Sequence, residues 1–309
     1  MVAKGRIRRG RAVRSGGLGG PAWLILLALP ALGALLIVAT VFWPERTEMP
    51  DVLRVGVLPD QSLDALQQRY QPLLGYLSDE VGVPFRLVVP DDYASLLDMF
   101  HMHEVDIAYF GGLTFLKARE ADDARALVMR DVDFDFRSSF LIRAERSERT
   151  IGEFRGKTLA FGSRLSTSGH LMPRHFLRQQ NIEPETWFAD VIFSEAHDAT
   201  AMLVRNGEVD LGVANAEIVE SMFRSGRLRR DEIRVIYQTP PYVDYVWAMR
   251  VGINVDLYDK VLFAFLKLSP ADPEDAAILA GLGATGFLPA RESEFGSLRA
   301  IAMALELLG

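Results

Sequence analysis

Three consecutive hydroxyl residues, Ser166, Thr167 and Ser168, stand where an apolar strand pattern ends and a helical pattern begins. The N-terminus of a helix carries backbone N–H groups without intrahelical acceptors and a partial positive charge, so it stabilises a bound anion. The hydroxyls add hydrogen-bond donors, and Gly169 lets an anion approach the backbone closely. Plain N-capping needs only one Ser or Thr and explains the same residues. The segment therefore indicates either an oxyanion site or a capped helix.

Four further polar side chains stand at the ends of predicted strands or in the connections that follow them. Tyr93 starts a helix, Tyr109 ends a strand, and His197 comes just before another helix. Asp244 lies in a proline-rich connection. Ligands of α/β proteins bind at the carboxyl edge of the sheet, which is where these residues are expected. The alternatives are that Tyr93 is a partly buried tyrosine beside an ordinary aspartate cap, that Tyr109 is a core aromatic, and that Asp244 caps the turn beside the nearby prolines.

The chain has no cysteine, which excludes disulfides, thiolate metal sites, iron–sulfur clusters and cysteine nucleophiles. The five histidines lack the i, i+4 spacing of a zinc-binding helix. They are His101, His103, His170, His175 and His197. The sequence also lacks a phosphate-binding loop and a nucleophile elbow. We therefore expect a protein that is not an enzyme and that binds no metal and no cofactor.

Charge is distributed unevenly along the 309 residues. The first 21 residues carry six bases and no acid, whereas the remaining 288 carry 28 bases and 41 acids. Nucleic-acid binding depends on neutralising phosphates with basic side chains, so the strongly acidic body excludes that function.

Residues 22–43 form a run of 22 amino acids without a charge. A helix of that length spans about 33 Å, enough to cross a hydrocarbon core of about 30 Å. By the positive-inside rule, residues 1–21 form a basic cytoplasmic tail, and the chain after a linker at 44–51 lies outside. The alternative is a cleaved signal peptide, whose apolar region is usually shorter. We expect an uncleaved signal anchor in the inner membrane and a body on its periplasmic side.

After the linker, strand-like apolar runs alternate with amphipathic helical stretches, which is typical of an α/β fold with mostly parallel sheets. Two sets of strand–helix–strand–helix–strand end in similar phrases, EVDIAYFG at 104–111 and EVDLGVAN at 208–215. The last 55 residues have helical patterns broken by prolines and must pack on an earlier sheet. We predict two lobes: residues 52–147 and 248–309 form the first, and residues 148–247 form the second.

The order of these phrases resembles the phosphonate/phosphite/phosphate-binding family of periplasmic solute-binding proteins that serve ABC importers. The resemblance runs from Leu53 to Leu288 and rests above all on the phrases GKTLAFG, STSGHLMPR, AHDAT, GEVDLG and TPPYVDYVW. It implies a type 2 periplasmic binding fold, whose two α/β lobes close on an oxyanion. It also implies seven ligand-binding residues, which are Tyr93, Tyr109, Ser166, Thr167, Ser168, His197 and Asp244. One departure is GGL at 111–113, where the family often has GPL.

We therefore expect a membrane-tethered monomer that captures a phosphonate, phosphite or phosphate and delivers it to an ABC permease. Tyrosines and hydroxyls hold the oxyanion, since no Arg or Lys is clearly aimed at the cleft. A carboxylate near an oxyanion repels it, so Asp244 decides which end group a ligand carries. Tyr242 and Tyr245, on either side of it, are bulkier than expected. The alternative function is a sensor that reports ligand occupancy to a membrane partner, although a 21-residue tail is too short for a kinase or cyclase domain.

Overall fold

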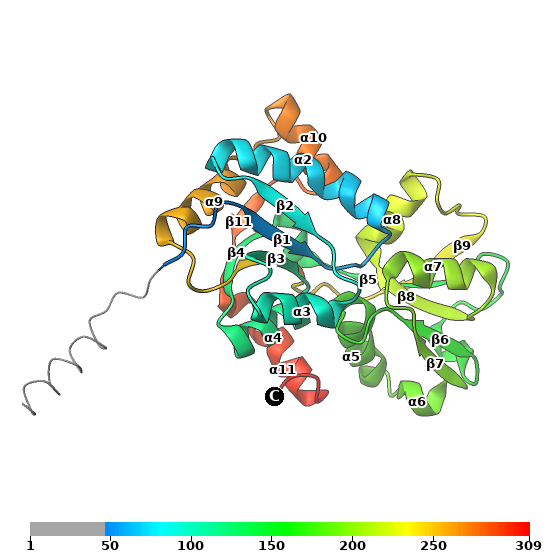
Figure 1. Ribbon diagram of the computed structural model, residues 1–309. Coiled ribbons are helices and arrows are strands. Elements are labelled where there is room, and N and C mark those ends of the chain that lie inside the picture. Colours follow the sequence, from blue (N-terminus) through cyan, green and yellow to red (C-terminus); the bar gives the residue numbers. More distant parts are fainter. Residues whose placement is uncertain (1–46) are drawn as a thin grey trace, which may run out of the picture. The chain divides into compact units, whose positions relative to one another are not determined.

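The computed structural model describes residues 47–309, which form two β-sheets with flanking helices (Figure 1). The predicted cytoplasmic tail, the predicted membrane helix and the first three residues of the predicted linker lie outside the described residues. Within residues 47–309, no helix is both long enough and apolar enough to cross a membrane.

The first sheet has six strands in the order β11-β4-β10-β3-β1-β2. Strands β2, β1, β3 and β4 run in one direction, and β10 and β11 run against them. The strands are β1 (Leu53–Val57), β2 (Phe85–Val88), β3 (Ile107–Phe110), β4 (Arg125–Arg130), β10 (Val246–Met249) and β11 (Phe287–Pro289). The sheet is therefore mostly parallel, as the sequence predicts, but β11 is a strand that the helical pattern of the last 55 residues concealed.

The second sheet has five strands in the order β7-β6-β8-β5-β9, of which β5 alone runs against the others. The strands are β5 (Ser138–Arg143), β6 (Thr158–Phe161), β7 (Asp190–Phe193), β8 (Leu211–Asn215) and β9 (Ile233–Gln238). Side chains of β5 alternate between two apolar clusters: Phe140 and Ile142 join one, and Leu141 joins the other. Both faces of this sheet are therefore covered.

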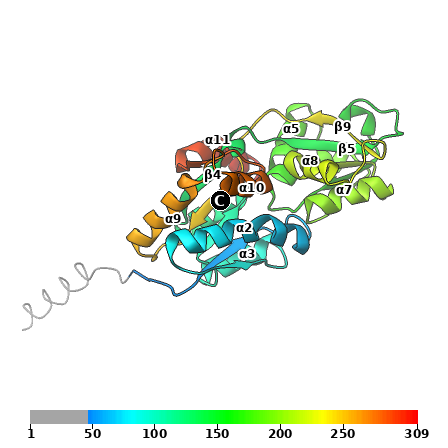
Figure 2. The ribbon, with the colours of Figure 1, turned by 90° about the horizontal axis from the view of Figure 1, so that it is seen from above.

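Helices cover both sheets, as the alternation of strands and helices predicts. Figure 1 shows α2, α9 and α10 on one side of the first sheet and α3, α4 and α11 on the other. Seen from above in Figure 2, α5, α7 and α8 gather around the second sheet. The helices are α2 (Leu63–Val81), α3 (Tyr93–His101), α4 (Gly112–Asp122), α5 (Met172–Gln179), α6 (Pro184–Trp187), α7 (His197–Asn206), α8 (Ala216–Arg224), α9 (Val255–Lys267), α10 (Pro273–Leu282) and α11 (Gly296–Ala304).

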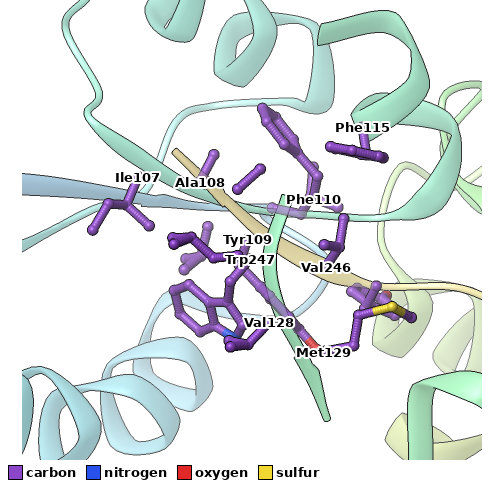
Figure 3. Close-up of a cluster of buried hydrophobic side chains, with 14 of the residues drawn as sticks. Ile107, Ala108, Tyr109, Phe110, Phe115, Val128, Met129, Val246 and Trp247 are labelled. Carbon is purple, nitrogen blue, oxygen red and sulfur yellow. The ribbon is translucent and has the colours of Figure 1, made fainter. Parts of the chain in front are cut away.

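The core of the first lobe is built around β3, β4 and β10 (Figure 3). Trp247 and Tyr109 pair across neighbouring antiparallel strands, and their rings lie 4.6 Å apart between centroids. Leu171 and Met172 belong to the same apolar cluster although they follow the second sheet's β6. Burial of this one continuous cluster therefore joins the start of α5 to the first lobe.

The chain crosses between the two sheets twice, and the two crossing segments lie side by side. Phe136 and Tyr242 form an antiparallel bridge, in which each N–H donates to the other's carbonyl at 2.9 and 3.0 Å. The first crossing comes before β5, so β5 belongs to the second lobe, whereas the predicted boundary after residue 147 assigned it to the first. Apolar patterning identified the strand correctly, but it carries no information about which strand pairs with it.

The described part of the predicted linker is fastened to the first lobe. Glu48 forms a parallel bridge with Ile253, its N–H donates to the carbonyl of Gly252 at 2.6 Å, and its carbonyl accepts the N–H of Asn254 at 2.9 Å. Its carboxylate also forms an ion pair with Arg250. Residues 47–49 are therefore held against the segment that joins β10 to α9.

Candidate functional site

The hydroxyl run opens the helical segment that follows β6. Ser166 is the N-cap, and its Oγ accepts the N–H of Gly169 at 2.9 Å. The helix begins as a π-helical turn, Thr167–Leu171, and continues as α5. Because the cap satisfies the third N–H of the helix, the N–H groups of Thr167 and Ser168 have no intrahelical acceptor. Two backbone N–H groups at this terminus therefore lack an intrahelical acceptor, and its first turn is wider than that of an α-helix.

The three hydroxyls have different partners, a distinction that the sequence does not reveal. Ser166 caps its own helix, whereas the Oγ1 of Thr167 reaches the first lobe and accepts the N–H of Leu113 at 2.9 Å. Ser168 is fully buried, and its Oγ has no hydrogen-bond partner within residues 47–309. Ser168 therefore has a free hydroxyl, and Thr167 joins the two lobes.

His197 is fully buried at the start of α7. Its Nδ1 accepts the N–H of Asn215 at 3.2 Å, so the neutral ring carries its proton on Nε2. Burial lowers the pKa of His197 to about 4, which keeps the ring neutral at pH 7. Nε2 has no partner in the described part of the chain. A Cβ at Gly169 would lie 2.9 Å from His197 Cε1, so the ring sits directly against the hydroxyl run.

Asp244 is fully buried in the second crossing. Its Oδ1 accepts the N–H of Gly112 at 2.8 Å and thereby caps α4. A proline at position 112, as in the family pattern GPL, would have no N–H to donate. Burial raises the pKa of Asp244 to about 7, against the opposing effect of hydrogen bonds from Gly112 and Thr167. Oδ2 has no partner among residues 47–309.

Tyr93, at the start of α3, and Tyr109, in β3, are both buried. Burial raises the pKa of Tyr93 well above its ordinary value, and the charges of Asp60 and Asp244 raise it further, so these side chains are near neighbours. Burial likewise raises the pKa of Tyr109, whose ring stacks on Tyr245 with 5.1 Å between centroids. Neither Tyr93 nor Tyr109 has a hydroxyl partner in residues 47–309. Tyr109 is therefore a core aromatic with a free phenol group, which unites the two interpretations.

Asp60 and Asn215, which were not predicted, complete the cluster. Asp60 follows β1, and its Oδ2 accepts the hydroxyl of Tyr245 at 3.0 Å. Asn215 ends β8, donates from Nδ2 to the Tyr245 hydroxyl at 3.1 Å and caps α8 through its Oδ1, which accepts the N–H of Ile218. Asp60 lies three residues after the end of β1 and Asn215 is the last residue of β8, so their position at the carboxyl edge was the available signal. The hydroxyl of the bulky Tyr245 therefore links Asp60 in the first lobe to Asn215 in the second lobe.

Six buried polar atoms of this cluster have no hydrogen-bond partner within residues 47–309. They are Asp60 Oδ1, Tyr93 Oη, Tyr109 Oη, Ser168 Oγ, His197 Nε2 and Asp244 Oδ2. Each unsatisfied buried polar atom costs about 1–3 kcal/mol, so a group of them indicates a place where a ligand completes the bonding. The hydroxyls of the two tyrosines and Ser168 and the Nε2 of His197 carry a proton at pH 7. Oδ2 of Asp244 can also donate when that carboxyl group is protonated. In the described residues, no group of His, Asp and Glu side chains suitable for a metal ion is present.

Residues 55–295 match the family described as "ABC transporter, phosphonate, periplasmic substrate-binding protein". The chain belongs to this family. Among the members of the phosphonate-binding family, the probable ABC transporter phosphite binding protein PhnD1 of Prochlorococcus marinus is 33% identical over 206 residues, which are 64% of this chain and 69% of that protein. The phosphonates-binding periplasmic protein of Escherichia coli is 23% identical over 294 residues, which are 92% of this chain and 86% of that protein.

A solved structure gives the same result for the fold. PhnD1 of Prochlorococcus marinus in complex with methylphosphonate superposes with a TM-score of 0.78 and 28% identity, covering 84% of this chain and all of that one. The two-lobed periplasmic binding fold is therefore confirmed, and the chain is a substrate-binding protein of the ABC phosphonate-transporter class. The relatives named here are binding proteins and not enzymes, as the sequence predicts. The family indicates an extracytoplasmic location.

Proposed function

We propose that this protein captures a small tetrahedral oxyanion, a phosphonate, phosphite or phosphate, between its two lobes and delivers it to an ABC permease. The observation that carries the proposal is the group of six buried polar atoms that have no hydrogen-bond partner within residues 47–309. Five of them belong to the seven residues that the sequence singled out, and the sixth belongs to Asp60. The methylphosphonate bound by the related PhnD1 is a ligand of this class.

Neutral donors are suited to such a ligand because they hold the anion without a buried counter-charge. Tyr93, Tyr109 and Ser168 supply hydroxyls, His197 supplies Nε2–H, and the helix terminus supplies backbone N–H groups and its dipole. Protonated Asp244 donates through Oδ2 to an oxygen of the ligand. Hydrogen bonds to a charged group contribute about 1.5–3 kcal/mol each, which supports tight capture without an ion pair.

Closure of the lobes accounts for capture and release. In the described part of the chain, four direct hydrogen bonds join the lobes around the site. They run from Leu113 to Thr167, from Ser62 to Asp198, from His197 to the carbonyl of Asp60 and from Asn215 to Tyr245. The ligand gains donors from both lobes only when they are closed, so it shifts the population toward the closed state. The paired segments at Phe136 and Tyr242 are the hinge.

Calorimetric titration of a panel of anions into the purified body tests this function. Methylphosphonate, phosphite and phosphate are expected to bind with a stoichiometry of one. Acetate is the control, because it is planar and has fewer acceptor oxygens than the six atoms require. Absence of heat with every tetrahedral anion would contradict the proposed function.

We propose further that the protein is held at the membrane by residues 22–43 and acts as a monomer on the periplasmic side. The support is the uncharged 22-residue run after six bases. Mass spectrometry of the mature protein tests the tether. An intact N-terminal segment is expected, whereas a chain that starts near residue 44 would mean that the segment is a cleaved signal peptide. Light scattering of the body tests the monomer.

A further inference from the structure

A polar cavity of about 360 Å³ lies where α2 and the end of α10, from the first lobe, meet α8 of the second. Figure 1 shows the N-terminal end of α2 beside α8. The side chains that line this cavity, here called the rim cavity, include Gln61, Arg69, Glu217, Arg224 and Arg227. Gln61 directly follows Asp60, so the rim cavity adjoins the candidate site from the outside.

The rim cavity carries excess positive charge in an otherwise acidic body. Arg227 pairs with Asp198 at 2.8 Å. Neither Arg69 nor Arg224 has a carboxylate within ion-pair distance in the described part of the chain. Glu217 is the one acidic residue in the lining. Within residues 47–309, Arg69 and Arg224 thus form no ion pair at the junction of the lobes.

Two of the residues that line the rim cavity each hold a buried donor. Within residues 47–309, Arg69 Nε and Gln61 Nε2 are buried and have no acceptor, although the guanidinium of Arg69 is held by a 3.0 Å bond from Nη2 to the carbonyl of Leu282. Donors without acceptors are the groups that the oxygens of an anion satisfy. The charge of Arg69 also reaches inward: burial raises the pKa of Asp60, and Arg69 is the strongest influence that lowers it.

We propose that the rim cavity is an anion-binding entrance, in which Arg69 and Arg224 hold an anionic ligand before it passes to the inner cluster. This inference rests on the proposed function for the identity of the ligand. The inner cluster binds through neutral donors, so it has little long-range attraction of its own. Arginines without an ion-pair partner near a binding site raise the local concentration of an anion and its association rate, and salt screens this effect.

NMR titration of the protein with methylphosphonate tests the entrance directly. The Nε–H signal of Arg69 reports the rim cavity, and the ring signals of His197 report the inner cluster. Both sets are expected to move, and in Ser168→Ala the Arg69 signal moves at the same concentrations while the His197 signals need more ligand. If Arg69 does not respond at any millimolar concentration, the entrance is refuted. If Arg69 responds and His197 does not, the inner site fails and the entrance stands.

Stopped-flow association rates test the role of the charges. The double variant Arg69→Gln, Arg224→Gln is expected to bind methylphosphonate about ten-fold more slowly at low ionic strength and at the wild-type rate in 0.5 M salt, with an unchanged dissociation rate. The matched control is the double variant Arg149→Gln, Arg155→Gln, which removes two exposed arginines of the second lobe that do not line the rim cavity. An equal decrease of the association rate in the control would mean that only the net charge of the protein matters, and it would contradict the proposal.

Discussion

At the scale of single residues, the site consists of side chains whose orientation and protonation are set by the residues around them. Asn215 fixes the tautomer of His197, Gly112 and Thr167 fix the orientation of Asp244, and burial keeps the phenols protonated. These groups hold their donors in place before a ligand arrives, and so less ordering is needed on binding.

Burial of neutral His197 makes the stability of the ligand-free protein depend on pH. Its pKa is about 4 in the folded chain and about 6.5 in the unfolded chain, so the unfolded state binds more protons between these values. The free energy of unfolding therefore falls by roughly 3 kcal/mol as the pH drops from 7 to 4. Urea unfolding of His197→Gln should show a shallower fall. A second buried imidazole, His170, also has a pKa of about 4 and leaves a residual slope.

The affinity for a simple oxyanion should depend on the proton of Asp244. Below pH 7 the carboxyl is protonated and donates to the ligand, and above pH 7 its charge repels the ligand. The affinity for methylphosphonate should therefore fall by about ten-fold per pH unit above 7, in addition to any change caused by the ligand's own titration. Asp244→Asn is neutral at every pH and still donates, so its calorimetric profile should lack this fall. If wild type and Asp244→Asn show the same pH dependence of affinity, Asp244 does not contact the ligand.

How far the sequence predicts these residues depends on local context. Strand ends and helix starts are readable from patterning, and all seven predicted residues are buried in the structure. Asp60 follows a strand and Asn215 ends one, but Asp and Asn at such positions are most often ordinary helix caps. The partners of Thr167 and Asp244 lie in the other lobe or across a crossing, and sequence spacing holds no record of such contacts.

At the scale of elements, the turn from β6 into α5 requires close packing of backbone against His197. A Cβ at Gly169 would lie 2.9 Å from His197 Cε1 and 3.1 Å from Gly162 Cα, and the glycine backbone cannot yield cheaply. Gly169→Ala should weaken methylphosphonate binding at least ten-fold and destabilise the fold by about 1–3 kcal/mol. The matched control, Gly75→Ala in α2, meets nothing within 4 Å and should be neutral or stabilising. Calorimetry and urea unfolding measure both variants.

The elements themselves were largely predictable, and their pairing was not. The alternation of strands and helices predicts two mostly parallel sheets, because each apolar run is bounded by a helical stretch. The place of β5 in the second sheet and the addition of β11 to the first depend on hydrogen bonds between distant segments. The hydrophobic pattern predicts which face of a strand is buried, but it does not predict which strand pairs with it.

At the scale of the whole molecule, closure depends on a few bonds between the lobes. Asp198 Oδ2 accepts the N–H of Ser62 at 3.1 Å from the first lobe and pairs with Arg227 in its own lobe. Asp198→Ala should destabilise the closed state by about 1–2 kcal/mol and speed ligand dissociation about ten-fold. Stopped-flow dissociation measures this rate. Asp231→Ala is the control, because its partner Arg229 lies in the same lobe; an equal change there would contradict the role of Asp198.

The most direct test of the proposed binding site is calorimetric titration of methylphosphonate into wild type and Ser168→Ala. The hydroxyl of Ser168 is buried and has no partner within residues 47–309, so its removal costs the fold little and takes one donor from the ligand. The wild type should bind one equivalent, and Ser168→Ala should bind about ten-fold or more weakly with an unchanged melting temperature. Equal affinity in the two proteins would mean that the oxyanion does not occupy this cluster.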